Sequence, residues 1–200
     1  MNICSVKAYD VVNGPGIRHS VWVAGCNIHC NDCFNIEAQS FDIGEPWKRV
    51  MDRTKKYWVG SHINGLSILG GEPLDYRNFD ATVDLCLYFK EACPDKNIMI
   101  WTGYDIQTCG GSFFKKDFSQ GNDWIDNPNA ALNFYMQKID IDILMRVADW
   151  IVYGPYISSK RTLTEWYGST NQRILDCRKS LEHKEIINTS RELIMEELDL

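Results

Sequence analysis

Residues 24–35 read AGCNIHCNDCFN and place Cys26, Cys30 and Cys33 at C-x3-C-x2-C spacing, directly after an apolar, strand-like run. Three thiolates on one short loop can each bind one iron of a cubane cluster, which leaves the fourth iron open to another ligand. An open iron indicates chemistry rather than a purely structural role. The stretch therefore predicts an iron–sulfur site on a loop at the end of a strand.

A second motif, Gly70-Gly71-Glu72-Pro73, follows the apolar run at residues 66–69. The glycines allow backbone carbonyls to approach a ligand closely, and Pro73 ends the strand because it has no N–H to donate. Ligands of open α/β sheets bind outside the carboxyl ends of the strands. The cysteine loop and this glycine loop are therefore expected to share one mouth.

Strand-like and helix-like segments alternate along the chain, which predicts a parallel sheet covered by helices. The expected strands are 17–24, 66–69, 97–101, 149–153 and 174–175. The expected helices are 47–58, 79–90 and 139–147, with a short C-terminal helix that begins after Ser190. A full eight-unit barrel needs about 250 residues. The 200 residues here predict an α/β fold with parallel strands arranged as an open, partial (βα) barrel.

The length and the 44% hydrophobic content are typical of one domain spanning residues 1–200. An insertion is expected at about 110–137, where Gly, Asn, Asp and Pro interrupt any periodicity, and a helical tail is expected from about 185. A loop of that length is usually functional or disordered. Its aromatic residues either dock a partner or fold back onto the domain.

A formal net charge of -6 argues against a nucleic-acid surface. No apolar run approaches the roughly 18 residues of a membrane span, and the N-terminus lacks the apolar core of a signal peptide. These features predict a cytoplasmic protein with reduced thiols and no membrane partner. The five cysteines outside the loop show no metal-ligand spacing and are expected to be small buried residues: Cys4, Cys86, Cys93, Cys109 and Cys177.

The paired C-x3-C-x2-C and G-G-E-P motifs resemble those of the radical S-adenosylmethionine enzymes. Within that superfamily, four further stretches resemble the activating enzymes of anaerobic (class III) ribonucleotide reductases. They are GPGIR at 14–18, FN at 34–35, WTGY at 101–104 and GSTNQR at 168–173. The resemblance covers about residues 5–105 and 145–177.

The resemblance implies a [4Fe-4S] cluster with three cysteine ligands, Cys26, Cys30 and Cys33, and one open iron. It implies that reductive cleavage of S-adenosylmethionine gives a 5'-deoxyadenosyl radical, which abstracts hydrogen from a glycine of the reductase. An electron donor of unknown identity is also required. Radical abstraction needs no acid–base group, so no catalytic side chain is nominated. The implied cofactor-binding residues are Asp32, Cys33, Phe34, Gly70, Gly71, Glu72, Asn171 and Arg173.

Three points stay open at this stage. Asp32 stands where many radical S-adenosylmethionine enzymes carry an aromatic residue. The run Asn171-Gln172-Arg173 either contacts the cofactor carboxylate or the incoming partner or forms a polar turn. The protein is alternatively an activase of another glycyl-radical enzyme or a small-molecule radical enzyme. A more distant alternative is a non-catalytic zinc-binding module with His29 as the fourth ligand, although His29 and Cys30 are adjacent and would reach one tetrahedral ion poorly.

Overall fold

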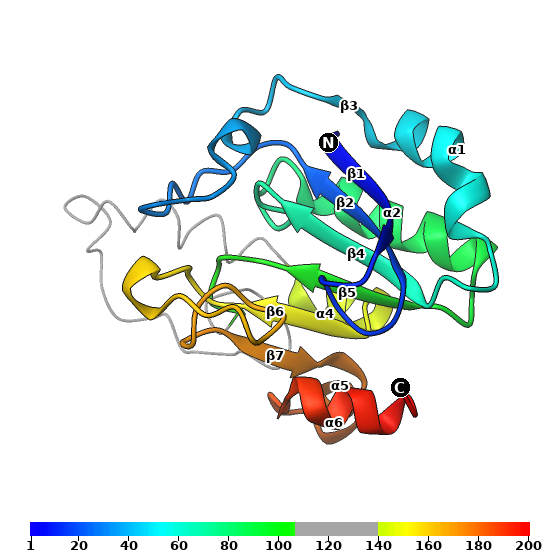
Figure 1. Cartoon of the computed structure of the whole chain (residues 1–200), viewed down its shortest axis with the longest axis vertical. Coiled ribbons are helices and arrows are strands. Elements are labelled where there is room, and N and C mark those ends of the chain that lie inside the picture. The colour runs from blue at the N-terminus through cyan, green and yellow to red at the C-terminus, as the bar shows by residue number, and fades with distance from the viewer. Residues whose placement is uncertain (107–139) are drawn as a thin grey trace.

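The computed structural model describes residues 1–106 and 140–200, which form a mixed α/β fold around one eight-stranded sheet (Figure 1). The strand order is β3-β1-β2-β4-β5-β6-β7-β8. The strands are β1 (Asn2–Asp10), β2 (Arg18–Val23), β3 (Glu45–Pro46), β4 (Gly65–Gly70), β5 (Asn97–Trp101), β6 (Trp150–Tyr153), β7 (Arg173–Asp176) and β8 (Asn188–Thr189). The predicted insertion at 110–137 lies outside the described residues.

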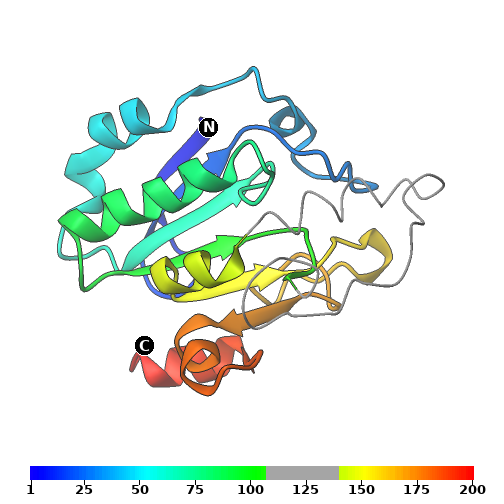
Figure 2. The same ribbon diagram turned by 180° about the vertical axis from the view of Figure 1, so that it is seen from behind.

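The helices are placed unequally on the two faces of the sheet. They are α1 (Trp47–Trp58), α2 (Phe79–Ala92), α4 (Ile141–Val147), α5 (Cys177–His183) and α6 (Arg191–Glu197), with 3-10 turns η1 (Ile36–Gln39) and η3 (Ser158–Lys160). Figure 2 shows α1, α2 and α4 lying across one face. Within the described residues, none of these helices is long and apolar enough to cross a membrane.

The four central strands, β2, β4, β5 and β6, are parallel, whereas the flanking strands pair antiparallel. The predicted α/β fold with parallel strands is therefore confirmed for the centre of the sheet. The antiparallel flanks were not predicted, and β1 in particular was missed because its polar and apolar residues mix without a long apolar run. The parallel strands end on the same side of the molecule, toward the loop that follows β2 (Figure 1).

Alternate residues of the central strands supply two separate cores. Ile98 and Ile100 of β5 join the larger core beneath α1, α2 and α4. Their neighbour Met99 faces the other way and packs with Trp150 and with Ile194 of α6. This alternation is the two-residue period of a strand buried on both faces. The face that carries Met99 also continues toward the candidate site.

Arg18 is a fully buried cation at the amino-terminal end of the parallel strands. Its guanidinium donates to the Leu66 carbonyl (2.6 Å), the Pro15 carbonyl (3.1 Å) and the Ser67 and Asn97 side chains. Burial lowers the pKa of Arg18 to about 9, so the group stays charged at neutral pH. Arg18 thus ties β2, β4 and β5 together at the end of the sheet opposite the predicted mouth.

His19 is fully buried between β2 and α1, where its Nε2 lies 3.3 Å from Thr54 Oγ1. Burial lowers the pKa of His19 from 6.5 to about 4. Because the unfolded chain takes up this proton at higher pH than the folded chain, stability is lost as pH falls from 6.5 toward 4.

We therefore expect His19 to account for a fall of about 2 kcal/mol in the free energy of unfolding between pH 7 and pH 5. A His19→Leu variant should show an acid-induced loss that is smaller by that amount. Urea unfolding of both proteins at the two pH values measures the difference. An equal acid-induced loss in both proteins would contradict this assignment.

Candidate iron–sulfur and cofactor site

The cysteine loop leaves the end of β2 and is anchored at its start by backbone hydrogen bonds. Gly25 N donates to the Ala38 carbonyl (2.7 Å) and Cys26 N donates to the Gln39 carbonyl (3.0 Å). Gly25 has a φ of 95°, a conformation that favours glycine. The first cysteine is therefore held against η1 rather than on a free loop.

Two residues of the loop adopt the left-handed conformation, His29 with φ 50° and Asp32 with φ 56°. Each directly precedes a cysteine, Cys30 or Cys33. His and Asp are among the side chains that tolerate this region best. His29 is further held by its Nδ1, which lies 2.9 Å from Gln39 Oε1. The two reversals bend the loop so that its thiols border one cavity.

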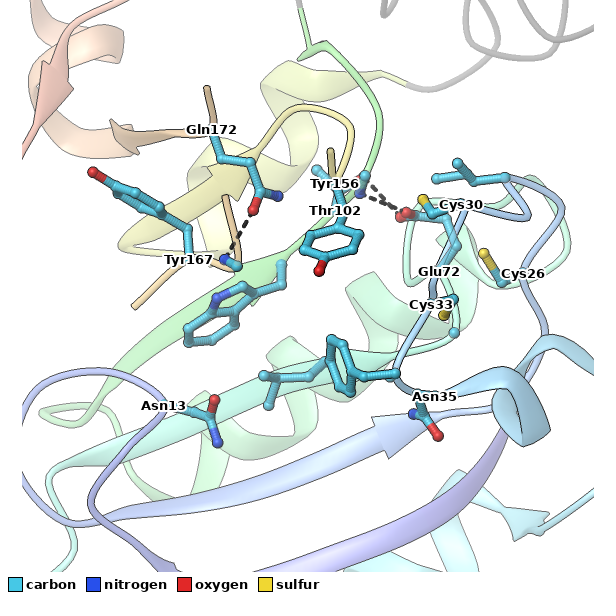
Figure 3. Close-up of a pocket in the computed structure, with 18 of the residues that line it drawn as sticks. Asn13, Cys26, Cys30, Cys33, Asn35, Glu72, Thr102, Tyr156, Tyr167 and Gln172 are labelled. Atoms are coloured by element: carbon cyan, nitrogen blue, oxygen red, sulfur yellow. Dashed lines mark hydrogen bonds between the residues drawn. The ribbon is translucent and has the colours of Figure 1, made fainter. Parts of the chain in front are cut away.

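That cavity has a volume of about 300 Å³, and Figure 3 shows the three thiols on one side of it with Tyr167 and Gln172 on the other. Its size is at the lower end of the range for small-molecule sites. The lining is Val12, Asn13, Cys26, Ile28, Cys30, Cys33, Phe34, Asn35, Gln39, Leu69, Gly70, Gly71, Glu72, Trp101, Thr102, Gly103, Tyr156, Thr162, Leu163, Glu165, Trp166, Tyr167, Gly168 and Gln172.

Two of the three thiols have raised pKa values. Burial, with a smaller effect from the charge of Glu72, raises the pKa of Cys26 to about 12, and burial also raises the pKa of Cys30. A bound metal would supply the positive charge that holds them as thiolates. In the described residues, no three His, Cys, Asp or Glu side chains gather around one point as a single ion requires. In a cubane cluster each thiolate binds a different iron, whereas a structural zinc ion needs four ligands around one point.

The glycine loop packs directly against the start of the cysteine loop. Gly71 N donates to the Val23 carbonyl and Glu72 N donates to the Gly25 carbonyl, each at 2.7 Å. A Cβ at Gly71 would lie 2.4 Å from the Gly25 oxygen and 2.7 Å from the Ala38 oxygen. Only glycine therefore allows the two loops to approach this closely, which explains the glycine at position 71.

Glu72 is a buried carboxylate that joins the loops after β4 and β5. Its Oε1 accepts from Thr102 Oγ1 (2.7 Å) and Leu74 N (2.8 Å), and its Oε2 accepts from Gly103 N (2.8 Å). Burial raises the pKa of Glu72 to about 7, although these three donors favour the ionised form. The carboxylate therefore organises the wall of the cavity through contacts within the protein.

We expect Glu72→Gln to lower the free energy of unfolding by about 1–3 kcal/mol and Tm by roughly 2–12 °C. The amide nitrogen of Gln can donate but not accept, so either Gly103 N–H or the donors at Oε1 would lose their acceptor. Calorimetry of the variant and of Glu91→Gln, an exposed carboxylate on α2, measures the effect. Equal Tm values for the two variants would contradict the role of Glu72.

A polar brace behind the cavity connects both loops to the start of α2. Asn78 Nδ2 donates to the Ala24 carbonyl and to the Glu72 carbonyl, both at 3.0 Å. Asn27 Nδ2, from the cysteine loop, donates to Asp75 Oδ2 at 2.7 Å. The relative position of the two motifs is thus set by buried hydrogen bonds rather than by the loops alone.

The structure brings most of the predicted site residues together but not all of them. Cys26, Cys30, Cys33, Phe34, Gly70, Gly71 and Glu72 line the cavity. Asp32 is exposed and is not part of the lining. Asn171 and Arg173 also lie outside it: Asn171 Nδ2 donates to the Pro155 carbonyl (2.8 Å), and Arg173 Nη1 donates to the Thr170 and Gln172 carbonyls.

Gln172, between these two residues, lines the cavity; the sequence placed it in the same candidate segment, but only Asn171 and Arg173 were nominated as cofactor-binding residues. Its Oε1 accepts from Gly168 N (2.9 Å) and Ser169 N (3.1 Å), and its Nε2 donates to the Gly154 carbonyl (2.9 Å). Through these hydrogen bonds, Gln172 joins the start of the segment that follows β6 to its end. The aromatic lining residues Tyr156, Trp166 and Tyr167 come from the same segment, and their position after a parallel strand was the only available signal.

Comparison with known proteins defines the class of this site. A family described as a 4Fe-4S single cluster domain matches residues 12–175, which include all three thiols and both loops of the cavity. The class is therefore that of iron–sulfur proteins with one four-iron cluster domain.

Three relatives are similar over most of their length, and all three are named anaerobic ribonucleoside-triphosphate reductase-activating protein. The relative from Vibrio cholerae is 32% identical over 87% of this chain and 97% of its own length. The one from Escherichia coli K12 is 33% identical, over 86% and 96% respectively. The relative from Enterobacteria phage T4 is 27% identical, over 87% and 93%. The chain belongs to the family of anaerobic ribonucleoside-triphosphate reductase-activating proteins.

Proposed function

We propose that this protein activates an anaerobic ribonucleotide reductase by generating a glycyl radical on it with a [4Fe-4S] cluster and S-adenosylmethionine. The observation that carries the proposal is that Cys26, Cys30 and Cys33 border the same cavity as Gly70, Gly71 and Glu72. Membership of the activating-protein family supports the identity of the target.

In this proposal Cys26, Cys30 and Cys33 hold the cluster and leave one iron open. The bare backbone at Gly70 and Gly71 accommodates the ammonium end of S-adenosylmethionine, while Glu72 holds this wall in place through Thr102 and Gly103. Cys33 and Phe34 lie against the adenosyl part. Asp32, Asn171 and Arg173 lie outside the cavity lining and act through their lining neighbours Cys33 and Gln172.

When bound, the cluster and S-adenosylmethionine supply a 5'-deoxyadenosyl radical through one-electron cleavage of a carbon–sulfur bond, with methionine as the other product. A low-potential one-electron donor provides the electron. That radical would take a hydrogen atom from a glycine Cα of the reductase, which would leave the unpaired electron on the glycine. The chain's own residues orient the reactants and exclude water, and no side chain moves a proton.

We also infer that the open sheet is a partial barrel. In the described residues its terminal strands, β3 and β8, each pair with one neighbour only, which supports an open rather than a closed sheet. Leu69 and Trp101, at the carboxyl ends of β4 and β5, line the cavity on the face opposite α1 and α2. An open side would admit a loop of a large protein substrate.

The proposal is tested by anaerobic reconstitution with iron and sulfide, followed by reduction in the presence of S-adenosylmethionine. Chromatography should detect 5'-deoxyadenosine, and electron paramagnetic resonance should detect a glycyl radical once the cognate reductase is added. Bound zinc without any 5'-deoxyadenosine would contradict the proposal and favour a non-catalytic module. Formation of 5'-deoxyadenosine without a radical on the reductase would point to another substrate.

A further inference from the structure

The most exposed large apolar side chains of the described residues are not scattered over the surface. Leu163 is 84% exposed and Phe34 82%, and Val11, Ile36 and Val12 are 62–68% exposed. No other large apolar side chain in residues 1–106 and 140–200 exceeds 56%. Single exposed apolar residues are ordinary, but a group gathered at one place marks an interaction site.

These five residues come from three loops that border the cavity. Val12, Phe34 and Leu163 themselves line it, and Val11 and Ile36 are near neighbours of two of them in the chain. The three loops are those between β1 and β2, after Cys33, and after η3. We call these five residues the apolar collar.

The backbone beneath the collar is held by hydrogen bonds, so the exposure is not that of fraying loops. Asp10 Oδ1 accepts from Val12 N (3.0 Å), and the Asn35 carbonyl accepts from Ala38 N (3.1 Å). Beside Leu163, Thr162 N donates to the Gly168 carbonyl (3.0 Å), and Trp101 Nε1 donates to the Trp166 carbonyl (2.6 Å). Rigid backbone that presents unpacked apolar side chains is suited to binding because little further ordering is needed.

We propose that the apolar collar is the docking surface for the reductase, whose glycine-bearing loop enters the cavity between the three loops. This inference rests on the proposed function, because hydrogen abstraction requires the glycine Cα to reach the inside of the cavity. The cofactor occupies the interior, and the three collar side chains that line the cavity, Val12, Phe34 and Leu163, are still 62–84% exposed. Contacts from three loops would surround an incoming segment, and a central residue without a side chain would let its Cα approach the cofactor closely.

The test uses the reconstituted protein and its cognate reductase, with a Val11→Asp/Ile36→Asp double variant, because these two collar residues lie outside the cavity lining. Both side chains are largely exposed, so the fold should tolerate the change, whereas burying two carboxylates in an interface is unfavourable. The matched control is Leu87→Asp, a 52%-exposed leucine on α2, on the helical face of the sheet. Three quantities are measured: the Kd for the reductase, glycyl-radical yield, and 5'-deoxyadenosine formation without reductase.

We expect the double variant to raise the Kd at least tenfold and to lower the radical yield correspondingly at sub-saturating reductase. Its 5'-deoxyadenosine formation without reductase should stay within twofold of the unmodified protein, and Leu87→Asp should match that protein in all three measurements. A Kd within twofold of the control would overturn the proposal that the collar is the docking surface. So would an equal loss of uncoupled cleavage, since that would place the collar in the cofactor site.

The experiment distinguishes failure of the docking proposal from failure of the proposed function. If the unmodified protein forms no 5'-deoxyadenosine, the proposed function fails, while the Kd still judges the collar as a binding surface. If the double variant instead abolishes a dimer of this chain in size-exclusion chromatography and leaves reductase binding unchanged, the occupant is a second copy and the proposal is wrong.

Discussion

Replacing Cys30 with alanine is expected to abolish stable cluster binding and to lower 5'-deoxyadenosine formation by far more than a hundredfold. Loss of an outer contact typically lowers metal affinity or activity by about 10–100-fold, and a direct ligand matters more. Cys30 lies between the other two cysteines on a loop bent by His29 and Asp32, and no further thiol of residues 1–106 and 140–200 lines the cavity. Iron and sulfide content after anaerobic reconstitution, measured beside product formation, provides the test.

Cys4→Ala is the matched control for this substitution. Cys4 is also a partly buried free thiol, but its Sγ donates to the Trp22 carbonyl (3.2 Å) and it is absent from the cavity lining. Its removal should leave the cluster and activity unchanged and reduce stability by about 1 kcal/mol. If Cys30→Ala kept a full complement of iron and sulfide, the three-cysteine ligation proposed here would be incorrect.

Gly71→Ala is expected to lower kcat/KM for S-adenosylmethionine cleavage by about a hundredfold. The added Cβ would meet the backbone oxygens of Gly25 and Ala38 at 2.4 and 2.7 Å, and backbone cannot rotate away as a side chain can. The glycine loop must therefore move away from the cysteine loop. A displacement of about 1 Å at a reacting geometry is sufficient for an effect of this size.

The control is Gly60→Ala, after α1, where the new Cβ would meet only the exposed, rotatable ring of His62 at 2.7 Å. That variant should cleave S-adenosylmethionine at the normal rate. Binding of S-adenosylmethionine, measured by equilibrium dialysis beside the cleavage rate, separates lost affinity from lost geometry. Unchanged kcat/KM in Gly71→Ala would show that the close approach of the two loops does not matter.

Local sequence patterns were sufficient to predict the central strands of the sheet. The predicted strand at 97–101 coincides with β5, and those at 17–24 and 66–69 match β2 and β4 to within a residue. β4 and β5 are buried on both faces and mostly apolar, whereas β2 becomes apolar only from Val21, after three buried polar residues. Ser190 was also read correctly as a helix cap, since its Oγ accepts from Leu193 N.

Local sequence patterns did not predict the edge strands of the sheet or part of the cavity lining. β1 and β8 are recognisable only from the partners they pair with, because their own residues carry no sustained apolar pattern. In the GSTNQR segment, Asn171 and Arg173 were chosen, yet Gln172 faces the cavity. Neighbouring polar residues in a turn look equivalent in sequence, and only backbone direction decides which one points inward.

Short local motifs in the sequence were sufficient to predict the chemistry of this protein. The cysteine spacing specifies a cluster loop, the G-G-E-P run specifies a close backbone approach, and the apolar runs specify parallel strands, because each depends on residues adjacent in the chain. The union of the two loops in one cavity, the buried bonds of Glu72 and Asn78 that hold it, and the apolar collar at its mouth depend on contacts between residues tens of positions apart. Such contacts follow from packing, so they became visible only in the folded chain.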